Sequence, residues 1–216
     1  MSLITLKNVK KEYGKNQVLF ENLSLEIEKG EFVGLVGKSG AGKTTLLNII
    51  GLITDISEGT ITIDSHKNLS MNGKNAMILR RYTIGYLFQN YGLIEDESVL
   101  WNLKLALEYK KVKKEEKLKL INKYLKQFEL SDMLNKKVYQ LSGGEQQRIA
   151  IIKLILQESQ IILADEPTSG LDKENELIVM KLLKELNEKG ITIIMVTHNM
   201  NLCDCFSRVI NVENFR

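Results

Sequence analysis

Residues 37–44 read Gly37-Lys-Ser-Gly-Ala-Gly42-Lys43-Thr44 and match the phosphate-binding pattern G-x-x-x-x-G-K-[S/T]. The apolar run 32–36 precedes the pattern and a helical segment follows it, which is the strand–loop–helix setting that the pattern requires. The glycines let backbone N–H groups surround phosphate oxygens, and the helix start adds its positive end. Lys43 supplies a charge at the β- and γ-phosphates, and Thr44 supplies a hydroxyl for Mg²⁺. The stretch therefore predicts a nucleotide-binding α/β fold, and an incidental glycine turn is the alternative.

A second polar site is expected where the apolar strand Ile161-Ile-Leu-Ala-Asp165-Glu166 ends in two carboxylates. Asp165 at the strand tip would hold Mg²⁺, directly or through water. Glu166 would face the γ-phosphate, where a base can orient and deprotonate water. Acids at the end of a buried strand have little structural purpose, so we weigh a purely structural pair below this catalytic interpretation.

A third stretch reads Leu141-Ser142-Gly143-Gly144-Glu145-Gln-Gln-Arg148. Ser142 and Glu145 have the spacing of a capping box, so a well-capped helix is the simplest interpretation. Two glycines in the first turn weaken a helix by about 1 kcal/mol each relative to alanine, which indicates that something approaches the backbone closely. Because N–H groups at a helix start attract negative charge, we expect a second phosphate-binding helix start here.

Together these three stretches resemble the ATP-binding subunits of ATP-binding cassette (ABC) transporters, and the resemblance extends over essentially all 216 residues. It implies ATP and Mg²⁺ as ligands, ATP hydrolysis, and head-to-tail pairing with a second copy of the chain. In such a pair, residues 37–45 of one subunit and residues 142–145 of the other enclose each ATP. The nucleotide-binding residues that the resemblance adds within the first loop are Lys38, Ser39, Gly40, Ala41 and Thr45.

The resemblance also assigns four residues outside the three stretches. Tyr13 would stack on adenine, with strand packing as the alternative, and Asp172 would lie in a loop that crosses to the second subunit, with a helix cap as the alternative. Gln89 would touch Mg²⁺ and the attacking water, with an exposed polar strand end as the alternative. His198 would bond the γ-phosphate, with a capped core histidine as the alternative.

The expected roles form two overlapping sets. The catalytic residues are Glu166, His198, Gln89 and Lys43. The Mg²⁺ ligands are Thr44, Gln89 and Asp165.

The remaining pattern predicts a P-loop NTPase fold with a three-layer α/β core, a β-rich edge and a helical insert in a single domain. Residues 1–88 and 159–216 form the core with its edge, and residues from about 89 to 158 form the insert that carries the Ser142 motif. Alternation of apolar and polar residues predicts strands within residues 4–36, and further strands are expected at 60–64 and, from apolar runs, at 161–164, 191–196 and 209–212. Periodicity predicts helices at 44–52, 97–129, 144–157 and 173–189, with a short one before 209, and residues 65–82 are expected to be irregular.

Charge and composition limit the partners. The net charge of +3 and the sparse aromatics give no indication of nucleic acid. Residues 104–126 hold nine lysines against three glutamates, a local balance of +6. A solvated helix face is the favoured interpretation, and anionic lipid head groups or an acidic partner are the alternatives. Cys203 and Cys205 are expected to be buried packing residues, with a redox role as the alternative.

The apolar stretches fall short of the roughly 20 residues that a membrane span needs, and no signal peptide is evident. We therefore expect a cytoplasmic protein that is peripheral on the inner face of the cell membrane, bound to separate permease subunits. The short chain resembles the macrolide-export, lipoprotein-release and bacteriocin-export group, which implies export of a peptide, bacteriocin, drug or lipid-linked cargo. A regulator of cell-wall hydrolysis at division or an iron–sulfur assembly ATPase is the alternative. The acids in Leu93-Ile-Glu-Asp-Glu97 stand where relatives carry proline and where a permease is expected to dock.

Overall fold

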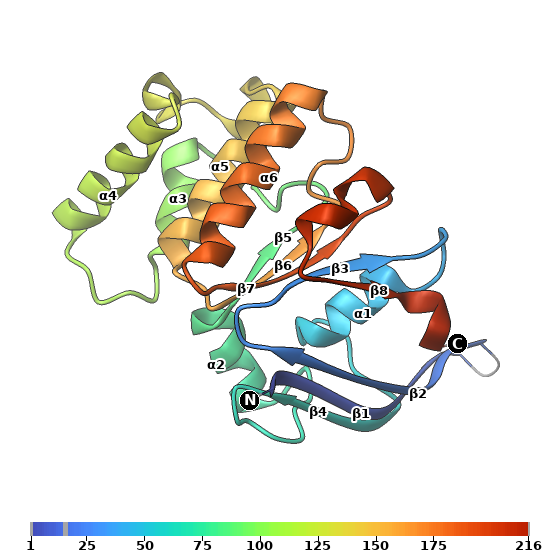
Figure 1. The fold of residues 1–216 in the computed structure, drawn as a ribbon. Helices are drawn as coiled ribbons and strands as arrows, with labels where there is room; N and C mark the ends of the chain where they lie inside the picture. The colour runs from blue at the N-terminus through green and yellow to red at the C-terminus, as the bar shows by residue number, and fades with distance from the viewer. Residues whose placement is uncertain (1, 15–16, 216) are drawn as a thin grey trace.

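The computed structural model describes residues 2–14 and 17–215. A small antiparallel sheet forms the edge drawn at the bottom of Figure 1. Its strands, in the order β2-β1-β4, are β1 (Ser2–Tyr13), β2 (Gln17–Glu28) and β4 (Glu58–Ile63). Leu23, Leu25 and Ile27 of β2 are buried while the residues between them are exposed, which is the expected alternation for a sheet with one covered face.

A parallel sheet of five strands forms the centre of the molecule. In spatial order its strands are β5 (Ile84–Leu87), β6 (Ile161–Asp165), β7 (Thr192–Val196), β3 (Phe32–Val36) and β8 (Arg208–Asn211). Every residue of β3, β6 and β7 is buried, because helices or the small sheet cover both faces. Since parallel strands end at the same edge, the segments that follow β3, β5, β6 and β7 gather there.

Helices divide between the two faces of this sheet. One hydrophobic core joins the small sheet, α1 (Lys43–Ile50) and α2 (Lys74–Tyr82) to the first face. A second core joins the other face to α3 (Val99–Ala106), α4 (Lys114–Gln127), α5 (Gly143–Gln157) and α6 (Lys173–Glu188). Short 3-10 helices lie at Ser131–Met133, Val138–Gln140, Met200–Cys205 and Val212–Phe215. The three-layer P-loop fold with a β-rich edge and added helices is confirmed.

Four local expectations were wrong. The stretch 65–82 is not irregular throughout, because α2 occupies 74–82; only Ala76 and Leu79 of α2 are buried, so its apolar stripe is too short to recognise. The helical region 97–129 is two helices, since the chain leaves the helix after Ala106 and re-enters it at residue 114. Because lysine and glutamate favour helix on both sides of this break, the sequence shows no sign of it. Strand β8 ends at residue 211, and residue 212 begins the last 3-10 turn.

The fourth correction concerns the two cysteines. Leu202 is the buried residue of the 3-10 turn at 200–205, whereas Cys203 is half-buried and Cys205 is exposed. With about three residues per turn, only one face of this segment meets the core. The cysteines are therefore not the buried packing residues that we expected.

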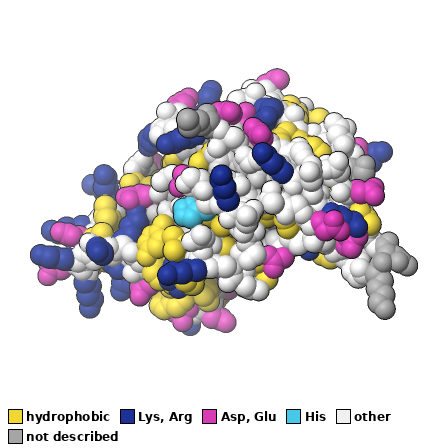
Figure 2. Space-filling view, turned by 90° about the horizontal axis from the view of Figure 1, so that it is seen from below, with side chains coloured by type: hydrophobic (Ala, Val, Ile, Leu, Met, Phe, Trp, Pro, Cys, Tyr) yellow, Lys and Arg dark blue, Asp and Glu magenta, His cyan; other side chains and the backbone are white. Residues whose placement is uncertain are grey.

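The basic segment lies at one end of the molecule, where α4 projects to the left in Figure 1. Dark blue side chains gather at the same end in Figure 2, mixed with acidic ones. Most of the lysines between residues 104 and 126 are exposed, which agrees with a solvated face and leaves the other two interpretations open. No helix among the described residues is both long enough and apolar enough to span a bilayer.

Candidate active site

The glycine loop connects β3 to α1 and turns sharply above the sheet edge. Gly37, Gly40 and Gly42 all have positive φ, and Gly42 at the start of α1 has φ +97°. A Cβ atom at Gly42 would lie 2.8 Å from the Phe20 ring, so a side chain is excluded by packing as well as by backbone conformation. Packing of the small sheet against the loop therefore leaves room only for glycine at position 42.

Lys43 is held beneath the arch of this loop and is only 5% exposed. Its ammonium donates to the carbonyl oxygens of Gly37 at 2.8 Å and Lys38 at 3.0 Å. The cation is thus bound by the loop itself and lies at the positive end of α1.

The next residue of α1 contacts the end of β6. The Thr44 hydroxyl donates to Asp165 Oδ1 over 3.1 Å. Burial raises the pKa of the Asp165 carboxyl, and the hydrogen bond from Thr44 partly opposes this. A hydroxyl and a buried carboxylate therefore meet at the sheet edge and present hard oxygen atoms to it.

Glu166 and His198 follow two neighbouring strands, β6 and β7. Glu166 Oε1 lies 2.6 Å from His198 Nε2, and the Glu166 amide donates to the carbonyl of Val196. Glu166 has φ +47°, a conformation that a non-glycine residue adopts at some cost and that often marks a functional position. The strand pairing thus brings an acid and a base together from residues 32 positions apart in the chain.

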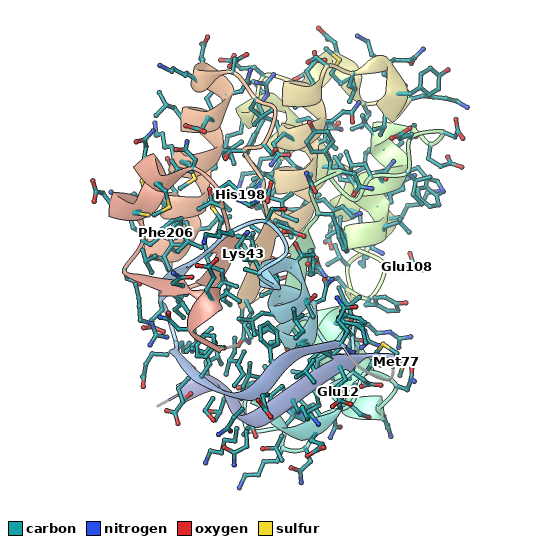
Figure 3. The ribbon with its side chains drawn as sticks, turned by 90° about the vertical axis from the view of Figure 1, so that its right-hand side faces the viewer. Glu12, Lys43, Met77, Glu108, His198 and Phe206 are labelled. Atoms are coloured by element: carbon teal, nitrogen blue, oxygen red, sulfur yellow. The ribbon has the colours of Figure 1, made fainter. Side chains whose placement is uncertain are left out.

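Lys43, Thr44, Glu166 and His198 open into one hollow of ≈ 290 Å³. Its lining is Tyr13, Gln17, Leu19, Ser39, Gly40, Gly42, Lys43, Thr44, Thr45, Glu166 and His198. The Tyr13 ring is 45% exposed, and its hydroxyl lies 3.3 Å from Thr45 Oγ1. Figure 3 shows Lys43 and His198 between the helices above and the small sheet below. The structure thus gathers expected residues from four separate segments of the chain.

A second hollow of ≈ 450 Å³ continues beyond Thr44 and Asp165. Gln89, two residues after the end of β5, lies on its rim together with Asn48 and Phe88. Gln89 is exposed, as its strand-end position implied. It therefore shares a cavity with both oxygen donors without bonding to either in the described structure.

The Ser142 motif forms the capping box that its spacing predicts. Ser142 Oγ accepts from the Glu145 amide at 3.3 Å, and Glu145 Oε2 accepts from the Ser142 amide at 2.7 Å. The bond from the Ser142 backbone is the largest of the effects that lower the pKa of Glu145. Ser142, Gly143 and Glu145 are open to solvent or half-exposed, so the start of α5 is accessible.

Arg148 and Asn175, to which the sequence assigned no role, connect this helix start to the Asp172 loop. Asp172 caps α6 by accepting from the Asn175 amide at 2.8 Å, and it also binds the Asn175 side chain at 2.9 Å. Arg148 donates to Asn175 Oδ1 at 3.2 Å, and a Cβ atom at Gly144 would lie 2.8 Å from that same oxygen. The close approach at Gly144 is therefore to Asn175 within the chain, which no local pattern indicates.

A family model described as "ABC transporter" matches residues 20–169, well over half of the chain. The chain belongs to this family. Among its relatives, the ABC transporter ATP-binding protein MJ1508 of Methanocaldococcus jannaschii is 41% identical over 98% of this chain and 96% of its own length. The macrolide export ATP-binding/permease protein MacB of Campylobacter jejuni is also 41% identical over 98% of this chain. The chain spans about a third of the length of that protein, 33%.

A solved structure of another ABC cassette, MJ0796, is similar over the whole fold. Its TM-score is 0.87 at 39% identity, over 96% of this chain and 93% of that chain. That structure is described as a dimer in a post-hydrolysis state bound to ADP and phosphate.

In this ABC cassette the expected site residues fall into two groups. The loop residues, Tyr13, Glu166 and His198 share one hollow, with Asp165 and Gln89 beside it. The Ser142 motif and Asp172 are absent from the lining of both hollows among the described residues. One chain therefore brings together only part of the expected site.

Proposed function

We propose that this chain binds and hydrolyses MgATP and that it powers transport through separate membrane permease subunits. The observation that carries the proposal is the hollow in which Lys43, Thr44, Glu166 and His198 meet at the start of α1. Within one cavity these groups provide a cation that can bind phosphate, a hydroxyl that can bind a metal ion, and an acid–base pair.

The loop fits a triphosphate. The first-turn N–H groups of α1 have no acceptors within the helix, and anions bind such groups readily. Lys43 would exchange two neutral carbonyl acceptors for phosphate oxygens, which form stronger, charge-assisted bonds. The exposed Tyr13, which lines the same hollow, is available to stack on adenine.

The donor atoms fit Mg²⁺. Thr44 Oγ1 and the Asp165 carboxylate already lie 3.1 Å apart, and oxygen donors of this kind are those that Mg²⁺ prefers. Gln89 lines the second hollow together with them and is the proposed third ligand. When bound, Mg²⁺ neutralises charge on the β- and γ-phosphates. Burial keeps water from the Asp165 carboxylate and raises its pKa. A cation bound beside the carboxylate would oppose this effect and favour the charged form.

Glu166 is the proposed general base. Its carboxylate opens into the hollow beside Lys43 and would orient a water molecule toward the γ-phosphate and accept its proton. His198 holds Glu166 Oε1 at 2.6 Å, which fixes the direction of the carboxylate. With ATP bound, His198 would donate its Nε2–H to a γ-phosphate oxygen in place of Glu166 Oε1.

A second copy would complete the site. The Ser142–Glu145 helix start is accessible but lies outside the hollow of its own chain, so a nucleotide reaches it only from another molecule. The dimeric MJ0796 structures support this arrangement for the present chain. In the proposed division, residues 89–158 form the helical insert that presents Ser142, and residues 1–88 and 159–216 form the core that presents Lys43.

The permease is proposed to dock beside Gln89, with the cassette peripheral on the cytoplasmic face of the membrane. Ile94 is 47% exposed and Trp101 is 38% exposed near this loop. Val99, which lies between them in the chain, is fully buried and packs within the second core, so it is not part of the docking surface. Similarity to a protein named for macrolide export supports export, and we propose a peptide, bacteriocin, drug or lipid-linked cargo.

Phosphate release from MgATP tests the catalytic part of this proposal. We expect Glu166→Gln to lower the rate by about 10²–10⁴-fold while ATP still binds, because the general base is lost. Glu174→Gln, on the exposed first turn of α6, is the matched control and should retain the parent rate. Equal rates in parent and Glu166→Gln would refute the assignment.

A further inference from the structure

The turn that follows Gln89 is attached to α5 at two points. Tyr91 and Gly92 both have left-handed backbone conformations, with φ +64° and +61°. Tyr91 donates its amide to the Phe88 carbonyl at 2.9 Å, and Gly92 donates to the Asn90 carbonyl at 2.8 Å. The turn is therefore a compact unit whose position depends on what holds it.

Lys153 of α5 provides the first attachment. Its ammonium donates to the Gly92 carbonyl oxygen at 2.7 Å. Within residues 2–14 and 17–215, no carboxylate lies within ion-pair distance of this half-buried ammonium. Burial lowers the pKa of Lys153. This ammonium is partly removed from water, and the Gly92 carbonyl is its acceptor among the described residues. Moving the turn away would leave the buried cation without that bond, which is costly, so the bond favours one position of the turn.

Tyr91 provides the second attachment. A Cβ atom at Gly143 would lie 3.1 Å from the Tyr91 hydroxyl, so this hydroxyl rests against the first turn of α5. Lys153 lies ten residues further along the helix, ~15 Å away at 1.5 Å per residue. The same turn thus contacts α5 near its start and near its end.

We infer that Lys153 is a positioning residue that fixes the Gln89 turn relative to the Ser142 helix start. The inference rests on the proposed function. Gln89 lies beside the nucleotide of its own chain, whereas Ser142 serves the nucleotide of the second chain. Lys153 therefore couples the two sites of the dimer: a shift of the Gln89 turn pulls on α5, and a shift of α5 moves Gln89.

The test compares Lys153→Met, Lys153→Arg and Lys117→Met. Methionine keeps most of the aliphatic stem and removes the donor, whereas arginine keeps a donor. Lys117 is a half-buried lysine of α4 and serves as the matched control. For Lys153→Met we expect kcat for MgATP to fall by about 2- to 30-fold, the range that coupling positions give, with KM within twofold of the parent. Lys153→Arg should recover most of the loss.

Hydrogen exchange in the isolated protein without nucleotide supplies a readout that does not depend on catalysis. Amides of residues 90–93 should exchange faster in Lys153→Met and at the parent rate in Lys153→Arg and Lys117→Met. Unchanged exchange in Lys153→Met, or faster exchange with an unchanged kcat, overturns the inference. A fall in melting temperature that arginine does not rescue would likewise mean a merely structural role. Failure of the proposed function is distinguishable, because it would appear in the parent as absent ATP hydrolysis before any variant is compared.

Discussion

Replacing Gly144 by alanine should separate stability from catalysis. The added Cβ would lie 2.8 Å from Asn175 Oδ1 and 3.0 Å from its Cγ, so the Asn175 side chain must move. That movement breaks the 3.2 Å bond from Arg148 and disturbs the contact with Asp172. The substitution therefore disconnects the start of α5 from the loop before α6.

The expected change in stability is small because two effects oppose each other. Loss of a hydrogen bond to a charged group costs about 1.5–3 kcal/mol, and alanine in place of glycine in a helix returns about 0.5–1 kcal/mol. A net loss of about 1 kcal/mol lowers the melting temperature by roughly 2–4 °C in a domain of this size. Hydrolysis of MgATP should fall by at least about tenfold, since displacement of positioning groups by an ångström can cost up to about 10²-fold.

The assay measures phosphate release and thermal unfolding for four variants, Gly144→Ala among them. Asn75→Ala, a substitution at an exposed position in the first turn of α2, is the control, because Asn75 lines neither hollow. Asn175→Ala and the double variant with Gly144→Ala form a cycle in which the losses should not add, since both act on one contact. Additive losses, or equal activity of Gly144→Ala and the parent, would refute the reasoning.

Three further outcomes are expected. Asp165→Asn should abolish Mg²⁺-dependent hydrolysis yet raise the melting temperature of the nucleotide-free protein by about 2–4 °C at neutral pH, because burial raises the pKa of Asp165 and its charged form opposes folding. This gain should shrink as the pH falls and the carboxyl protonates in the folded protein, and a gain independent of pH would contradict the cause. Tyr13→Ala should raise KM for ATP about tenfold and Tyr13→Phe should not, because stacking needs only the ring; an unchanged KM in Tyr13→Ala would remove Tyr13 from the site. Reversing the charges of Glu95, Asp96 and Glu97 should weaken co-purification with a permease encoded beside this chain and leave the hydrolysis rate of the isolated subunit unchanged, whereas an intact complex would place the interface elsewhere.

The parts of the site that follow from local chemistry could be predicted from the sequence. The loop around Gly42 and the capping box of Ser142 depend on backbone conformations and contacts within a few residues, and both formed as the spacing indicated. The carboxylates at 165 and 166 could be placed at the sheet edge because an apolar strand ends there. Continuous apolar runs likewise located the buried strands.

Contacts between distant helices and loops could not be predicted. The bonds from Arg148 to Asn175 and from Lys153 to Gly92 depend on how α5 packs against α6 and against the turn after β5. No spacing within one segment encodes such packing. The exposed Cys205 shows the same limit, since a cysteine is apolar enough for the core but the 3-10 turn directs it outward.

The shared nucleotide site is the central claim, and sedimentation of Glu166→Gln tests it most directly. Slow hydrolysis in this variant should preserve ATP between two chains, so the species with ATP should sediment at about twice the 24.6 kDa of one chain. Without nucleotide, the protein should sediment mainly as a monomer. A monomer that remains at high protein concentration with ATP shown to be bound would contradict the account.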